Sequence, residues 1–419
     1  MHARTIIIVL WKYRLNRLKL RKQSDVRIFV VGPPRTLLDE TNVDAYYQVE
    51  SPIRDHDNLQ LLQKVRELCS MHAASERRII AFERNLQKAV ARIRKEMDIE
   101  GFYPEQLKQL LDVRDAIHNP RKNGIATLRV CQCIELTNHV ALNIVNVFIF
   151  LLQDNSTVDL SGEYVVQEFI EGGYDFTALC TAKGGLIACA ASIETHRTIL
   201  ECVQNQLPYA IQLFSVEQTR DILPGVESFT TQVIKATFSK SYVGAIFIKG
   251  FYKGHNDIFF LGCTLEPESD TLRTLFAMSP TVSWETVLIE SHLENSKTSL
   301  NGITASPSVH HCVVNFPRAE GVLIHQTSIP KRPTSEMRVA WRCAEGQEMK
   351  NSVHIDDNVV QVYLSNSDHT RLIDEAQDIM QSTDITIDRN VLLERHSVCR
   401  RNLSRLNPRE LIRSCTTKD

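Results

Sequence analysis

The segment Val26–Val31 (VRIFVV) limits most strongly what this chain can fold into, because it is apolar except for Arg27 and ends at a Gly-Pro-Pro turn. A short apolar run that ends in turn-forming residues predicts a buried strand. Residues 58–69 and 85–97 then show helical spacing of apolar side chains, with a strand pattern at 78–82 between them. Strands that alternate with helices predict a parallel sheet covered by helices.

The first 24 residues are basic and contain the short apolar run Ile6–Trp11. Most of the positive charge follows this run, whereas a signal peptide carries its charge first. The lack of acidic residues keeps a mitochondrial presequence open as an alternative. We expect residues 1–24 to be a basic, partly ordered extension.

Strand patterns dominate after a further helix predicted at Pro104–Ala116. The predicted strands of this region are 127–133, 163–169, 176–181, 186–190, 234–238, 244–251 and 258–263. Beyond residue 301 shorter strands are expected at 309–316, 321–325, 337–343, 353–355 and 359–364. A helix at Thr370–Met380 and an Arg-rich, exposed tail from Asn390 complete the prediction.

Composition excludes several function classes. A chain of 419 residues with 43% hydrophobic residues predicts two or three globular domains. The net charge of −2 argues against a nucleic-acid partner. The apolar run Val140–Leu152 is too short to span a membrane and is interpreted as buried core. A lone Gly32, without a GxGxxG pattern, gives no support for a dinucleotide site.

Eleven scattered cysteines form no CxxC pair and no zinc-ligand spacing. This usage predicts reduced thiols and a cytoplasmic location. Cys180 and Cys263 lie in strand patterns and are expected to be buried and inert.

The most informative stretch is Tyr164–Leu179, YVVQEFIEGGYDFTAL. It has a strand, an acidic hinge, a double-glycine turn and an acidic residue on a new strand. A strand edge that leads into a tight turn exposes backbone groups able to bind an adenine edge, and a nearby carboxylate can bind ribose hydroxyls. A plain β-hairpin with an acidic turn is the alternative.

In this stretch and in the order of its elements, the chain resembles the ATP-grasp superfamily, and within it the carboxylate–amine ligases of the carnosine synthase and L-amino-acid ligase type. The resemblance covers most of residues 25–390. Met97–Gly101, Arg114–Asp115 and Gly124–Ile125 fit the family's pattern, as does Val309–Arg342. His310, His311 and His325 in the last stretch are interpreted as ordinary sheet residues, with a metal role as the alternative.

The resemblance implies a mixed α/β and α+β fold with a Rossmann-like first domain. The expected division is a basic extension (1–24), a pre-ATP-grasp domain (25–110), an ATP-grasp domain with a shortened lid (111–300), a C-terminal α+β module (301–389) and an Arg-rich tail (390–419). Carried over from the family, Glu168, Phe169 and Ile170 would line the adenine pocket, and Asp175 would bind the ribose.

Four features that the family uses to hold triphosphate and Mg²⁺ depart from its pattern. In the family a lysine follows Arg-Asp on this helix, but here Ala116 takes its place. Lys122 lies nearby and is out of register with the family's lysine. Residues 130–163 contain no lysine and no glycine-rich turn, which reflects either a real loss or a gap in the gene model. Lys249 and Gly262 stand where the family has metal-binding carboxylates, although a shifted register could bring Glu266 toward the metal.

These departures predict a nucleotide-binding pseudoenzyme. ATP is the expected ligand, and the lost carboxylates argue against Mg²⁺, because Mg²⁺ requires oxygen ligands. Lys249 could support metal-independent nucleotide binding, or it could point to solvent. The alternative function is an active ATP-dependent ligase that joins a carboxylate to an amine through an acyl phosphate, with an amino acid as substrate. Expected partners are therefore a nucleotide and a second copy of the chain, without nucleic acid or membrane.

Overall fold

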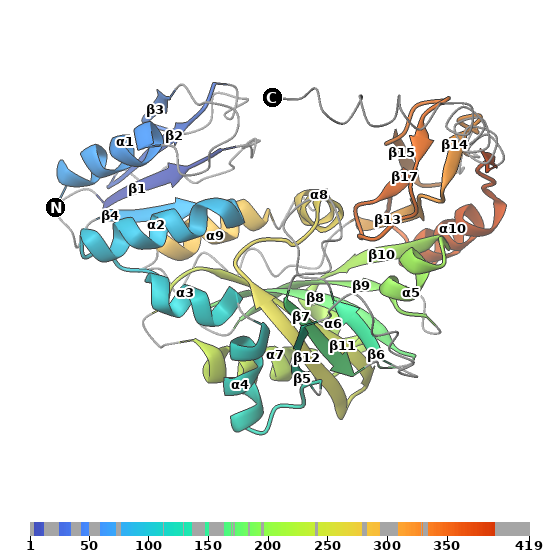
Figure 1. The fold of residues 1–419 in the computed structure, drawn as a ribbon, viewed down its shortest axis with the longest axis horizontal. Coiled ribbons are helices and arrows are strands. Elements are labelled where there is room, and N and C mark those ends of the chain that lie inside the picture. The colour runs from blue at the N-terminus through green and yellow to red at the C-terminus, as the bar shows by residue number, and fades with distance from the viewer. Residues whose placement is uncertain are drawn as a thin grey trace, which may run out of the picture. The chain divides into compact units, whose positions relative to one another are not determined.

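The protein is described by a computed structural model, which divides into two compact units that are treated separately below (Figure 1). Unit 1 comprises Met1–Thr198 and Gln212–Ser308, and unit 2 comprises Ile199–Ile211 and Val309–Asp419. The described residues are 4–11, 25–34, 43–49, 59–72, 77–111, 113–128, 130–135, 147–150, 163–168, 170, 172–182, 185–193, 197–238, 242–278, 283–293, 309–327, 329 and 334–389.

Unit 1 begins with a four-stranded parallel sheet in the order β3-β2-β1-β4. Its strands are β1 (Arg4–Val9), β2 (Val26–Gly32), β3 (Ala45–Gln48) and β4 (Arg77–Ala81). Helices α1 (Leu59–Ser70) and α2 (Arg84–Glu96) contribute Leu61, Val65, Leu86 and Val90 to the apolar core of this sheet. The predicted parallel sheet with covering helices is confirmed.

The N-terminal run corrects one expectation. Ile6–Trp11 was expected to belong to an extension, but Arg4–Val9 is β1, which pairs with both β2 and β4 at the centre of the sheet. Ile6, Ile7 and Ile8 are at most 1% exposed. A central strand is covered on both faces, so an uninterrupted run of β-branched residues is what its position requires. The basic residues 12–24 lie outside the described residues.

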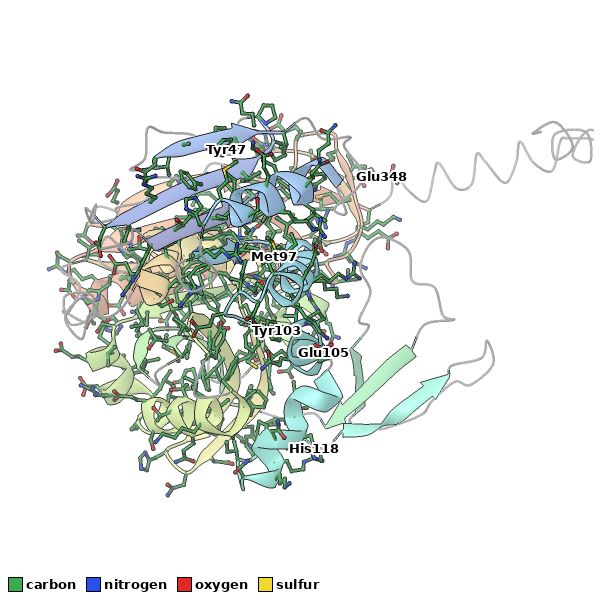
Figure 2. All side chains as sticks on the ribbon, turned by 90° about the vertical axis from the view of Figure 1, so that its left-hand side faces the viewer. Tyr47, Met97, Tyr103, Glu105, His118 and Glu348 are labelled. Atoms are coloured by element: carbon green, nitrogen blue, oxygen red, sulfur yellow. The ribbon has the colours of Figure 1, made fainter. Side chains whose placement is uncertain are left out.

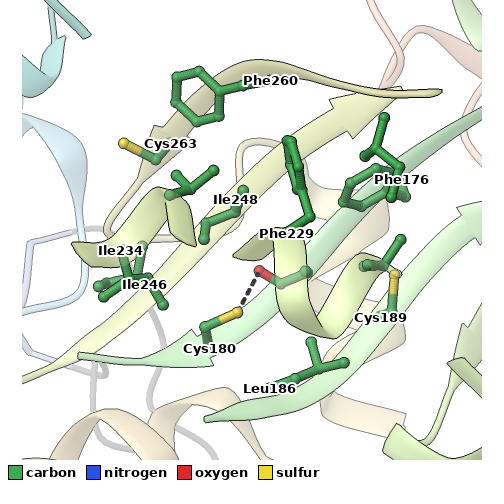
Figure 3. Packing of buried hydrophobic residues seen from close by; sticks show 14 of the residues in the cluster. Phe176, Cys180, Leu186, Cys189, Phe229, Ile234, Ile246, Ile248, Phe260 and Cys263 are labelled. Carbon is green, nitrogen blue, oxygen red and sulfur yellow. Dashed lines mark hydrogen bonds between the residues drawn. The ribbon is translucent and has the colours of Figure 1, made fainter. Parts of the chain in front are cut away.

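A second, antiparallel sheet of unit 1 has the strand order β12-β11-β8-β9. Its strands are β8 (Tyr174–Thr181), β9 (Leu186–Ser192), β11 (Ala245–Gly254) and β12 (Asp257–Thr264). On one face it packs against α3 (Pro104–Leu111), α4 (Val113–Lys122), α6 (Val216–Ile222) and α7 (Val226–Thr237). Figure 3 shows this core, in which Phe176, Ile246 and Phe260 meet Phe229 and Ile234 of α7.

The opposite face of the same sheet is covered by α8 (Asp270–Met278) and α9 (Trp284–Leu293). Phe247 of β11 makes edge-on ring contacts with Phe276 and Trp284, at 5.5 and 5.9 Å between ring centroids. Trp284 also meets Phe82, at the end of β4, so α9 packs against residues of both sheets. Edge-on aromatic pairs at such distances stabilise packing beyond the area that they bury.

The predicted strand at Ile234–Phe238 is wrong. Residues 226–237 form α7, in which Val226, Phe229, Thr230, Val233 and Ile234 are buried. These positions follow helical spacing, so the buried stripe runs along one face of a helix. The β-branched residues at its end gave a strand pattern only because the window was too short to include the whole stripe.

A small antiparallel sheet precedes β8, in the order β5-β7-β6, formed by β5 (Val130–Glu135), β6 (Val147–Phe150) and β7 (Glu163–Glu168). The run Val140–Leu152, interpreted as buried core, lies outside the described residues except for β6.

Unit 2 contains α5 (Ile199–Gln204) and the antiparallel strands β13 (His310–Pro317), β15 (Glu336–Trp341) and β17 (Asn358–Asn366), in the order β13-β17-β15. Helix α10 (His369–Ser382) packs on β13 and β17. A second small sheet has the order β16-β14-β18, from β14 (Gly321–Leu323), β16 (Glu348–Met349) and β18 (Ile387–Asp388). Strand β10 (Tyr209–Phe214) begins in unit 2 and ends in unit 1.

The predicted strand at Val353–Ile355 is also wrong. The backbone N–H groups of Val353 and His354 donate to Oδ2 of Asp357, at 3.1 and 3.0 Å, which closes a turn. Val353 is 82% exposed, so its β-branched side chain has no sheet to pack against. An aspartate that binds backbone groups a few residues away stabilises such turns.

The predicted tail from Asn390 lies outside the described residues, and the predicted boundaries at residues 110 and 300 stay predictions. Within the described part of the chain, no helix is long and apolar enough to cross a lipid bilayer.

Candidate functional site

The hinge sequence connects the small sheet to the antiparallel sheet of unit 1. Glu168 is the last residue of β7, where it pairs with Val147 of β6, and Ile170 is half-buried. Phe169 lies outside the described residues, as does the side chain of Glu168. The double glycine has φ values of 64° and 120°, and a Cβ at residue 173 would lie 2.7 Å from the carbonyl oxygen of Tyr252. A left-handed backbone and a close approach to β11 therefore both require glycine at Gly173.

Asp175 follows the turn on β8 and is half-buried. It lies opposite Phe251 of β11, and Thr177, two residues along β8, lies opposite Lys249. Alternate residues of a strand share a face, so Asp175 and Lys249 lie on the same face of the sheet as diagonal neighbours. The fold thus brings two of the predicted site residues together, on the face opposite to the core of Figure 3.

Lys249 forms an ion pair with Glu268, which lies in the loop after β12. Each of the two side chains is about one-third exposed, at 35% and 33%. The sequence did not single out Glu268 as a site residue. Glu266 and Glu268 are two residues apart, and the sequence pattern does not show which of them approaches Lys249. Only the path of the loop decides this.

Gly262 of β12 lies directly opposite Lys249 of β11. The two positions at which the resemblance expects metal-binding carboxylates are therefore cross-strand neighbours. A Cβ at residue 262 would meet nothing within 4 Å, so the space that a longer side chain needs is open. Neither the ammonium group of Lys249 nor Gly262 offers Mg²⁺ a side-chain oxygen, whereas the carboxylate of Glu268 beside Lys249 does.

Glu266 lies away from Lys249 and is only 8% exposed. Its carboxyl group accepts a hydrogen bond from the backbone N–H of Arg84, the first residue of α2. Burial raises the pKa of Glu266 to about 8, although the positive charges of Arg273 and Arg84 oppose the shift. The carboxylate that pairs with Lys249 belongs to Glu268, and the shifted register that would bring Glu266 toward a metal stays a prediction.

The resemblance expects a phosphate-binding lysine on α4, near Ala116 and Lys122. Ala116 is 4% exposed and packs inside the protein, while Lys122 is exposed at the end of α4. A lysine in place of Ala116 would have to bury its stem at this position. The side chains of Arg114 and Asp115 lie outside the described residues.

The remaining candidates are structural. Cys180 and Cys263 are free and buried, as predicted, and burial raises the pKa of each thiol to about 12, which disfavours the reactive thiolate. In unit 2, His311 lies in β13, and its Nδ1 is 2.9 Å from Oγ of Ser365. His325 was expected to be a sheet residue, but β14 ends at Leu323, and the exposed His325 lies beyond it with Nδ1 2.8 Å from Glu345. Among the described residues, no three His, Cys, Asp or Glu side chains are grouped as metal ligands would be.

Comparison with known proteins gives structural relatives only. No protein-family model matches the sequence, and no curated protein matches it. The fold is similar to that of L-amino acid ligase from Bacillus licheniformis, with a TM-score of 0.61, 9% identity, and coverage of 93% of this chain and 100% of that one.

Two further solved structures are N5-carboxyaminoimidazole ribonucleotide synthetase from Thermotoga maritima and phosphoribosylglycinamide synthetase from Anaerococcus prevotii. Their TM-scores are 0.52 and 0.51, at 11% and 14% identity, and each comparison covers 92% of this chain and 100% of the other. All three are ATP-grasp proteins. This chain has the ATP-grasp fold. The fold predicted from the hinge sequence and the order of elements is thereby confirmed.

Within the ATP-grasp fold, the face of β8, β11 and β12 that carries Asp175, Lys249 and Gly262 is the candidate site. The roles of Glu168, Phe169, Ile170, Asp175 and Lys249 in binding nucleotide stay predictions. The cytoplasmic location and the homodimer likewise stay predictions.

Proposed function

We propose that this chain binds ATP, or another nucleotide, at the hinge and the adjoining face of β8 and β11, and that it does not transfer the phosphoryl group. The ATP-grasp fold and the glycine turn before Asp175 support the nucleotide. The observation that carries the proposal is the Lys249–Glu268 ion pair opposite Gly262. At this position the chain has one positive and one negative side chain. Phosphoryl transfer would need several carboxylate oxygens there to bind metal ions.

The electrostatics favour binding without a metal. Phosphoryl transfer depends mainly on positioning and on charge that stabilises the transferred group. A partly exposed ion pair contributes only about 0–1 kcal/mol, so a phosphate group can replace Glu268 beside Lys249 at little cost. Lys249 would then supply one positive charge to the phosphates, which is enough to hold them and too little to replace two metal ions.

A nucleotide titration with and without EDTA tests the proposal. We expect ATP to raise the melting temperature equally in both conditions, because Lys249 and not Mg²⁺ neutralises the phosphates. Lys249→Met should weaken binding by about tenfold, the effect of losing roughly 1.4 kcal/mol. Lys253→Met is the matched control, since Lys253 lies on the same strand but is exposed. Binding that strictly requires Mg²⁺ would contradict the proposal.

Glu268→Gln gives a second test with the opposite sign. If phosphate must displace Glu268 from Lys249, removing the carboxylate charge should tighten ATP binding several-fold. Weaker binding in this variant would mean that Glu268 itself helps to hold the ligand, directly or through a metal.

The second candidate function is an active ligase that joins a carboxylate to an amine through an acyl phosphate. Glu268 favours it, because a carboxylate does lie beside the expected metal position, although from the following loop. The similarity to the Bacillus licheniformis ligase makes amino acids the first substrates to test. Release of ADP and phosphate that depends on added amino acids would establish this function. Saturable ATP binding without such release supports the binding protein.

A further inference from the structure

A buried guanidinium group between α2 and α9 lacks a counter-charge. Arg94, in the last turn of α2, is 6% exposed, and its Nη2 donates to the carbonyl oxygen of Ile79 at 2.6 Å. Its Nε is buried and has no hydrogen-bond partner. No carboxylate forms an ion pair with Arg94 within the described part of the chain. Burying a charge without a partner destabilises a protein by several kcal/mol. A bound ligand with the opposite charge would explain why Arg94 is buried here.

Arg94 lines a small cavity of about 20 Å³ in unit 1. Its polar lining comes from Gln87, Arg94, Tyr242 and His292, and the rest is apolar or glycine. A single water needs about 10–15 Å³, so the cavity has room for one particle of about that size.

Glycine keeps this space open. Gly101 has φ +141°, and a Cβ at this position would lie 2.9 Å from both Cδ and Nε of Arg94. The unpartnered Nε therefore faces a position where any side chain would close the space. Met97 caps the C-terminal end of α2, and Gly101 lies in the connection from there to α3, between Met97 and Tyr103, which are labelled in Figure 2.

The neighbouring groups supply donors but no negative charge. Nδ1 of His292 on α9 is buried without a partner. Burial and the nearby Arg94 and Arg78 lower the pKa of His292 to about 3, so its ring is neutral and can present one N–H. Burial raises the pKa of Tyr242, so the phenol stays protonated. Gln87 already donates to the carbonyl oxygen of Ala81 at 2.7 Å.

The guanidinium stays positive in this environment. Burial lowers the pKa of Arg94 to about 10, which still leaves it charged at neutral pH. One permanent cation, two unpartnered buried nitrogen atoms and room for a single small particle define the chemistry of an occupant. An occupant that satisfies these groups accepts hydrogen bonds, carries negative charge and is small.

We propose that this cavity binds one chloride-sized monovalent anion between Arg94 Nε and His292 Nδ1. The anion is structural: it neutralises the buried cation and links α2 to α9. This site is separate from the nucleotide face and does not depend on the proposed function.

Thermal unfolding in matched salts tests the anion site on the intact chain. We expect the melting temperature to rise saturably, by about 2–5 °C, when sodium chloride replaces sodium gluconate at constant ionic strength. Bromide should act similarly, and the larger iodide should act less. Equal melting temperatures in chloride and gluconate would mean that only water fills the cavity, and the proposal would be wrong.

Two arginines of α2 provide the matched variants. Arg94→Met should fold, because replacing a buried charge with an apolar side chain of similar length is often tolerated, and it should lose the chloride effect. Arg92→Met, at an exposed position of the same helix, should keep it. A chloride effect that persists in Arg94→Met would overturn the proposal.

Crystals grown in bromide give a test that needs no variant. An anomalous peak between Arg94 and His292 supports the site. A peak only elsewhere, or a water at this position, overturns it.

Discussion

Glu266 and Glu268 lie two residues apart in the loop after β12, yet their environments differ in every physical respect. Glu266 is buried and bonded to the N-terminal backbone of α2, and its pKa is raised to about 8. Glu268 is partly exposed and paired with Lys249 on the face of β11 for which we propose nucleotide binding. Glu266 stays protonated in its buried position and accepts a hydrogen bond from the first residue of α2. Glu268 is bound by the positive charge of Lys249, and we propose that a ligand can take its place there. Burial, and not residue type, decides which carboxylate belongs to the fold and which to the site.

The pH dependence of stability gives the largest expected difference between the two glutamates. The pKa of Glu266 is raised above its ordinary value of 4.5, so between about pH 4.5 and 8 the folded protein keeps a proton that the unfolded chain releases. The stability from this proton is complete below pH 4.5 and is lost as the pH rises to 8. We expect this contribution to fall by on the order of 2–4 kcal/mol over that range.

Urea unfolding at several pH values measures this slope. Glu266→Gln, which keeps the size but cannot ionise, should remove it, and Glu268→Gln should keep it. If both variants retain the slope of the unmodified protein, Glu266 is not the group responsible.

How far the sequence predicts this molecule depends on how local each signal is. The hinge was readable because a glycine turn and its flanking strands lie within sixteen residues, from Tyr164 to Leu179. The facing positions of Lys249 and Gly262 also follow from a local feature, the short connection between β11 and β12, although we did not predict the pairing from the sequence. The contrast between Glu266 and Glu268 was not readable, because it depends on α2, which is far away in sequence.

Two further features could not be predicted from the sequence for the same reason. The run Ile6–Trp11 looked like part of a basic extension, because its partner strands lie about twenty and seventy residues later in the chain. Arg94 sits in an amphipathic pattern of alternating charged and apolar residues, and nothing local indicates that this arginine is buried while Arg92 is exposed. Tertiary packing supplies such information, and a pattern along the chain does not.

Truncation of Glu266 should give the next largest effect. Glu266→Ala leaves the backbone N–H of Arg84 without its acceptor and opens a small cavity, which should cost about 1–3 kcal/mol in the free energy of unfolding. Glu266→Gln preserves an acceptor and should cost less than Ala at pH 7. Chemical denaturation of both variants at pH 7 measures the difference. An Ala variant as stable as the Gln variant would show that the contact with α2 is not needed.

Restoring carboxylates on the nucleotide face should convert it into a metal site. The double variant Lys249→Glu with Gly262→Glu places two carboxylates on cross-strand neighbours, and the open space at residue 262 can accept the side chain. We expect 10 mM Mg²⁺ to raise the melting temperature of this variant by about 2–4 °C and to leave the unmodified protein unchanged. Lys253→Glu is the control for added negative charge. An equal Mg²⁺ response in both proteins would argue against the inferred metal positions.

The smallest effect should come from Glu268→Gln on the stability of the protein without ligand. Both partners of the Lys249–Glu268 pair are about one-third exposed, and pairs of this kind contribute about 0–1 kcal/mol. The free energy of unfolding should therefore change by less than about 1 kcal/mol, and 1 M salt should remove most of the difference because it screens exposed charges. Denaturation curves at low and high salt measure both quantities. A larger, salt-independent loss would mean that this ion pair supports the fold as Glu266 does, and a phosphate could then not displace Glu268 at little cost.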